Sequence, residues 1–135
     1  MAKERIVDSA VEDPRKLFLI DGFGALLSAF LLGVVLVKFE HLFGIPKATL
    51  YFLASLPCFF AIYDLYVYFR KGKNTARFLR VIAVINLLYC VLSLGLAFYH
   101  IESVKLLGWL YILTEIAIVS VLACIELKVA QRISI

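Results

Sequence analysis

Four long apolar stretches separated by short polar connections dominate this 135-residue chain. They cover approximately residues 16–37, 48–69, 78–99 and 105–125. Because a helix rises about 1.5 Å per residue, about 20 residues cross a hydrocarbon core about 30 Å thick. Each stretch can therefore span a bilayer, and a polar tail of residues 1–15 precedes the first. The sequence predicts a single all-α integral membrane domain over residues 1–135.

The composition excludes most other classes of protein. Hydrophobic residues make up 64% of the chain and charged residues only 18%, whereas charged residues are near a quarter of a soluble domain. The net charge of +4 does not indicate nucleic acid, because the basic residues lie at the ends of the spans rather than on one basic face. Such flanks meet lipid headgroups, so the lipid bilayer is the expected partner.

The distribution of basic residues predicts the orientation. Of the 14 Lys and Arg residues, 11 lie in the N-terminal tail, the connection between the second and third spans, and the C-terminal tail. Cytoplasmic segments retain positive charge, so both termini are expected inside, and the bias is too strong for dual topology. Short connections force antiparallel neighbours, which gives an up-down-up-down four-helix bundle. We expect a multi-pass protein of the bacterial inner (plasma) membrane.

Each span carries one strongly polar side chain inside the apolar stretch. A charged group near the bilayer centre costs at least about 2.5–3.5 kcal/mol, so such residues face the bundle interior and find partners. Counting from the inner boundary places three of them in one layer of the inner half and the fourth deeper. These residues are Asp21, Asp64 and Asn86 in the layer, and Glu115 above it.

Tyrosines on the same helical faces are candidate hydrogen-bond partners for these groups. Tyr68 shares a face with Asp64, Tyr89 with Asn86, and Tyr111 with Glu115. No Lys or Arg lies at these depths, so we expect some of the carboxyls to be protonated. Glu115 is the first candidate, with Asn86 among its expected partners.

Three functional interpretations remain open, because no motif names a reaction or a cofactor. The polar residues either line a cavity that binds a proton, a cation or a small polar solute, as in a transporter or an ion- or proton-handling protein. Alternatively, they form a hydrogen-bonded core that only fixes helix register, as in an accessory or scaffold subunit. A membrane enzyme is third, because only the carboxyls are available for acid/base chemistry.

A second group of polar residues lies at the outer ends of the spans. Glu40 and His41 follow the first span, and His100 and Glu102 follow the third. Imidazoles and carboxylates could ligate Zn²⁺ or Cu²⁺, and two histidines could ligate haem. However, nothing in the spacing holds the ligands about 2 Å from one ion, and His and Glu are ordinary at interfaces. The sequence predicts no metal site.

The first span also carries a stripe of small residues. Small side chains at such spacing let a neighbouring helix approach closely in a membrane. We expect them to pack within the chain, with a homo-oligomer as the alternative. The stripe consists of Gly22, Ala25, Ala29 and Gly33.

Overall fold

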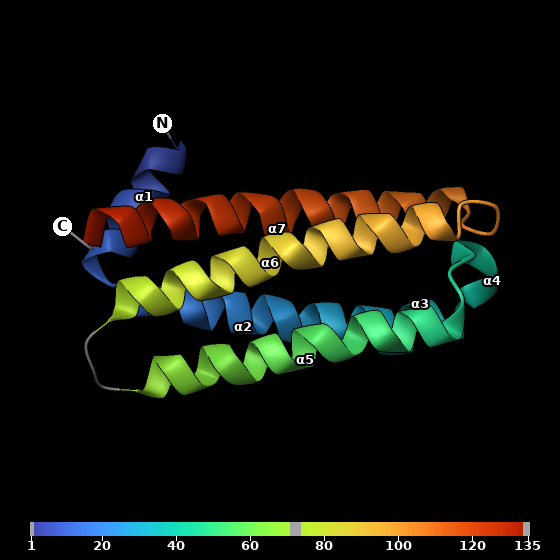
Figure 1. The fold of residues 1–135 in the computed structure, drawn as a ribbon, viewed down its shortest axis with the longest axis horizontal. Helices are drawn as coiled ribbons and strands as arrows, with labels where there is room; N and C mark the ends of the chain where they lie inside the picture. Colours follow the sequence, from blue (N-terminus) through green and yellow to red (C-terminus); the bar gives the residue numbers. More distant parts are fainter. Residues whose placement is uncertain (1, 71–73, 134–135) are drawn as a thin grey trace.

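The computed structural model describes residues 2–70 and 74–133, and every regular element in these ranges is a helix. Four helical runs are long and apolar enough to cross a membrane, so the chain is a multi-pass, all-helical membrane protein, as predicted. They lie side by side along the longest axis of the molecule (Figure 1). The four runs are Arg15–Lys38 (α2, η1 and α3), Lys47–Phe69 (α5), Thr75–Tyr99 (α6) and Leu106–Ile133 (α7).

The first three spans lie close to their predicted bounds, whereas the fourth does not. The last helix ends at Ile133 rather than at residue 125. Its final turns continue to bury residues at helical spacing, with Ala123, Val129 and Ala130 inaccessible. Lys71 and Lys73, which belong to the basic connection between the second and third spans, lie outside the described residues.

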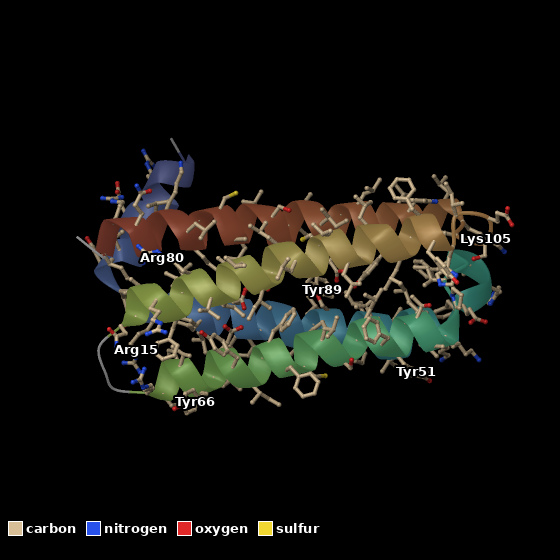
Figure 2. The ribbon with its side chains drawn as sticks, viewed as in Figure 1. Arg15, Tyr51, Tyr66, Arg80, Tyr89 and Lys105 are labelled. Atoms are coloured by element: carbon tan, nitrogen blue, oxygen red, sulfur yellow. The ribbon has the colours of Figure 1, made fainter. Side chains whose placement is uncertain are left out.

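The four long helices form two hairpins. The helix α2 (Arg15–Phe30) packs along α5, and α6 packs along α7, while the contact between the two pairs is much thinner. Both termini, the end of α5 and the start of α6 lie at one end of the molecule (Figure 1). We call this the terminal end and the opposite one the turn end. Figure 2 shows Arg15 and Arg80 near the terminal end, Lys105 at the turn end and Tyr89 between them.

The N-terminal tail is a helix, which the sequence analysis did not predict. This helix, α1 (Ala2–Glu12), packs against the last turns of α7. Val7 is buried with Val129 and Ala130, and Arg132 donates a hydrogen bond to Asp8 over 2.6 Å. The mixed charge of the tail obscured a short apolar stripe on one face of this helix. The stripe fastens the tail to the bundle.

The first span contains one π-helical turn. This turn, η1 (Leu31–Val35), separates α2 from the short α3 (Leu36–Lys38), and the N–H of Leu36 bonds to the carbonyl of Leu31, five residues earlier. A π turn holds one more residue than an α-helical turn in the same place. Within it, a Cβ on Gly33 would lie 3.2 Å from the Cβ of Ala54 on α5.

Close backbone contacts fix the turn end of the molecule. The chain bends at Phe39, forms α4 (Glu40–Phe43) and turns at Gly44, whose φ of 75° favours glycine. A side chain on Gly44 would overlap the carbonyl of Ser103, and one on Gly108 would overlap the carbonyl of Phe43. The N–H of Lys105 also donates a hydrogen bond to the backbone carbonyl of Phe43 over 2.9 Å. The start of α7 is thus locked onto α4.

The stripe of small residues on the first span packs partly against α5. A Cβ on Gly22 would lie 3.4 Å from the Cβ of Asp64, and Gly33 lies against Ala54. Both glycines thus allow the close approach of helices within the chain that the sequence predicted. Ala25 instead lines the cavity described below.

Two apolar clusters form the core, and polar side chains occupy the level between them. The cluster at the terminal end includes Phe18, Val67, Leu79, Ile82 and Val129. The cluster at the turn end includes Leu32, Leu36, Leu50, Leu53 and Ile112.

Candidate functional site

All four polar residues singled out from the sequence point into the bundle. The exposed fractions are 4% for Asp21, 0% for Asp64, 5% for Asn86 and 8% for Glu115. Buried positions are expected, because a charged or amide group facing lipid would lack a partner. They separate into two groups with different bonding.

Asn86 is the centre of the first group. Its Nδ2 donates to Oδ1 of Asp21 over 2.8 Å and to Oε1 of Glu126 over 3.3 Å. A side-chain amide nitrogen carries two hydrogens, so both bonds can form together. Asn86 therefore joins α2, α6 and α7 at one level.

Asp64 on α5 completes this group, which we call the inner polar cluster (Asp21, Asp64, Asn86 and Glu126). It lies against Gly22, and its charged neighbours are the carboxyls of Asp21 and Glu126. The structure thus brings together Asp21, Asp64 and Asn86, the three residues that the sequence placed in one layer.

Among the described residues, several carboxyl oxygens in the inner polar cluster accept no hydrogen bond from an N–H or hydroxyl group, and their polar neighbours are one another. They are Oδ2 of Asp21, both oxygens of Asp64 and Oε2 of Glu126. Three buried carboxyls side by side cannot all be ionised unless a cation joins them, because the repulsion and the loss of solvation add. The cluster must therefore hold protons or bind a cation, and its charge state belongs to the group rather than to one residue.

Glu115 on α7 forms the second group together with Tyr89, which lies about one turn of α6 beyond Asn86. Its Oε1 accepts a hydrogen bond from the Tyr89 hydroxyl over 2.9 Å, and its Oε2 accepts one from Tyr111 over 3.0 Å. We call these three residues the tyrosine clamp. The expectation that Asn86 pairs with Glu115 is wrong, because Asn86 is oriented toward Asp21 and Glu126. Each oxygen of Glu115 accepts a hydrogen bond from a tyrosine hydroxyl, whereas the oxygens of Asp64 face other carboxyls.

A cavity of about 520 Å³ lies between α2 and α7 and touches both groups. Asp21 and Asn86 reach it from the inner polar cluster, and all three residues of the tyrosine clamp line it. The remaining walls are mostly apolar. They include Leu27, Leu31, Phe60, Leu110, Ile118 and Leu122.

Tyr68 does not belong with the other predicted site residues. Its backbone carbonyl accepts hydrogen bonds from Nε of Arg15, over 3.0 Å, and from Nη2. The Arg15 guanidinium also lies 4.9 Å from the centre of the Tyr68 ring. Tyr68 thus anchors the start of the first span at the terminal end and is absent from the cavity wall.

Glu126 is the site residue that the sequence analysis missed. It is completely buried, but it lies one residue beyond the predicted end of the fourth span. Eleven residues separate it from Glu115, a spacing of about three helical turns that keeps both on one face. This spacing was the available signal, and extending the helix past Ile125 would have revealed it.

The polar residues at the turn end have other partners than a metal ion. Glu40 accepts a hydrogen bond from the N–H of Lys47 over 2.7 Å and so supports the start of α5. Nε2 of His100 lies 3.1 Å from the hydroxyl of Thr49, and Lys105 donates to the backbone carbonyl of His41. In the described ranges, no three His, Cys, Asp or Glu side chains gather as metal ligands would.

Comparisons of the chain with protein-family models, with curated proteins and with solved structures find no match. The inner polar cluster, the tyrosine clamp and the cavity are therefore the features from which a function can be inferred.

Proposed function

We propose that this protein is a small transporter or proton-handling protein in the inner membrane of a bacterium. Its four spans would run up-down-up-down across the bilayer, with both termini in the cytoplasm. The orientation is supported by the bias of basic residues toward the terminal end. With this orientation, the inner polar cluster lies in the cytoplasmic half of the membrane.

One observation carries the functional proposal. In the inner polar cluster, four carboxyl oxygens face other carboxyls with no N–H or hydroxyl donor, so only shared protons or a bound cation can satisfy them, and Asp21 joins them to a cavity. A structural polar core satisfies its buried groups, because each unpaired one is costly. Groups that bind and release protons need free acceptor atoms and a route to them. Asp21 would serve as the contact between the cavity and the deeper carboxyls of Asp64 and Glu126.

A scaffold subunit is the second candidate, and the tyrosine clamp favours it. Glu115 is fully bonded by two tyrosines, as expected of a residue that fixes helix register. If the inner polar cluster also held its protons permanently, the whole polar layer would serve packing alone.

Infrared spectroscopy of the protein in lipid nanodiscs separates the two candidates. Proton handling requires a carbonyl band from protonated carboxyls that shifts in D₂O and weakens as the pH is raised. Asp64→Asn should remove part of this titrating band, because neither oxygen of Asp64 has an N–H or hydroxyl donor and its charged neighbours are carboxyls. Glu102→Gln, an exposed carboxyl at the turn end, is the matched control and should leave the band unchanged.

A band that neither exchanges in D₂O nor responds to pH would favour the scaffold. The same holds if Asp64→Asn leaves the titrating band intact. In a second measurement, vesicles containing the protein should take up protons under an imposed potential faster than vesicles containing Asp64→Asn.

A further inference from the structure

The mouth of the cavity lies between the two hairpins. The helices α2 and α7 form its sides, and these two helices hardly touch each other. At the mouth, Leu27, Leu110 and Ile118 are exposed by 58%, 51% and 64%. Leu27 and Ile118 lie near the middle of their spans and Leu110 lies about one turn inside the start of α7, so in a membrane lipid chains border most of the mouth. A ligand would reach this cavity sideways from the hydrocarbon.

The inner wall of the cavity is acidic. Asp21 is almost fully buried and lines the wall; its Oδ1 is bonded to Asn86, and its Oδ2 has no N–H or hydroxyl donor and lies among the carboxyls of the cluster. Glu115 is the second carboxyl on the wall, and the lining contains no Lys, Arg or His. The electrostatic complement of such a wall is a single positive charge.

Aromatic rings and aliphatic chains surround these carboxyls. The rings of Phe60 and Tyr89 both line the cavity and meet edge to face, with 5.8 Å between their centres. Aromatic faces attract cations that have lost their water. The volume of about 520 Å³ lies within the usual range for sites that enclose a small organic molecule.

We propose that this cavity binds an amphiphilic organic monocation, which enters from the bilayer between α2 and α7. The proposal rests on the proposed proton-handling function, because the cation would replace a proton at Asp21. One proton leaves the inner polar cluster as one positive charge arrives, so the buried charge stays the same. The apolar part of the ligand fills the space between Leu31, Phe60 and Leu122.

Two ions of the same shape and opposite charge provide the test. Tetraphenylphosphonium is the cation and tetraphenylborate the anion. Binding of each is measured to the protein in nanodiscs, with empty nanodiscs as the background for partition into lipid. We expect saturable binding of the cation only, with release of protons into a weakly buffered solution.

Substitutions locate the bound cation. Asp21→Asn keeps an oxygen for Asn86 but removes the charge, and should weaken cation binding by about tenfold or more, the usual effect of losing a buried charged partner. Ile118→Trp should slow or block entry, because Ile118 lies exposed at the mouth. Glu102→Gln should bind as the wild type does. Circular dichroism and size-exclusion elution verify that each variant is folded.

Four results would overturn the proposal. Equal binding of both ions, with no effect of Asp21→Asn, would show an apolar pocket without charge selection. If the cation shows no saturable binding but the carboxyl band still titrates, the ligand is rejected and the proton-handling function stands. If neither cation binding nor a titrating band is found, the ligand and the proton-handling function are both rejected. Efficient crosslinking between copies through a cysteine at Ile118 would show that a second chain fills the mouth.

Discussion

At the scale of residues, buried carboxyls in this protein occur in two bonding states. Glu115 has a hydroxyl donor for each oxygen, whereas Asp64 has none for either among the described residues. Because buried carboxyls that face one another cost stability, Asp64 holds a position that packing alone would not favour. The two residues should therefore respond differently to the same kind of substitution.

Substitutions at Glu115 test the structural half of this contrast. Glu115→Gln should change the free energy of unfolding by less than about 1 kcal/mol, because the amide can bond both tyrosine hydroxyls. Glu115→Leu should cost about 1–3 kcal/mol for each hydroxyl left without a partner. Unfolding by titration from mild detergent into sodium dodecyl sulfate measures both. Equal stability of the two variants would mean that the tyrosine clamp contributes nothing.

If Glu115 also handles protons, Glu115→Gln should abolish cation or proton exchange while the fold persists. If its role is structural, exchange should continue in this variant. The vesicle assay for proton uptake distinguishes these outcomes.

At the scale of elements, hydropathy and charge predicted the four spans well, but they did not predict α1, η1 or the last turns of α7. The spans were predictable because lipid demands about 20 apolar residues for each crossing. The helix α1 carries too few apolar residues for that signal. Hydropathy did not predict the extension of α7, because the charged residues Glu126 and Lys128 lower the hydropathy where a span would end. In the structure, Glu126 is nevertheless buried against Asn86.

The pairings within the site were harder to predict than the depths. Depth follows from counting residues along a helix, and it brought Asp21, Asp64 and Asn86 to one level. Which donor faces which acceptor depends on the rotation and tilt of each helix, which counting residues along the chain does not give. The sequence therefore grouped Tyr68 with the site, although this residue anchors Arg15 instead.

Two glycines within helices test how the elements meet. Gly108→Ala should destabilise the protein by about 1–3 kcal/mol, because its Cβ would overlap the carbonyl of Phe43 and overpacking costs this much. Gly95→Ala is the matched control, since no atom lies within 4 Å of the added Cβ. It should be neutral or stabilise by up to about 1 kcal/mol through helix propensity. The same detergent titration measures both, and equal losses would contradict the proposed lock between α4 and α7.

At the scale of the whole molecule, the proposed orientation depends on charge alone and can be tested directly. Single cysteines are placed in a chain lacking Cys58, Cys90 and Cys124. A cysteine at Asn74 or Arg132 should react with a membrane-impermeant maleimide only after the cells are opened, and one at Lys47 in intact spheroplasts. Labelling of position 74 from outside would show that the orientation is the opposite one, with the inner polar cluster in the outer half of the membrane.

The π-helical turn at Leu31–Val35 has a consequence for how this chain can change in length. The first span is held from within by the bond of Asp21 with Asn86, and the chain just after it is held at Gly44, which packs on Ser103 and Lys105. Each residue of an α-helix adds about 100° of rotation about the helix axis. The single extra residue in the π turn therefore determines how the two anchors are oriented relative to each other around that axis. Losing one residue inside the turn would restore a plain α-helix and leave both anchors facing their partners. Loss of one residue in α5 would rotate one end of that helix by about 100° relative to its partners. A one-residue deletion should therefore be tolerated in the π turn and not in α5.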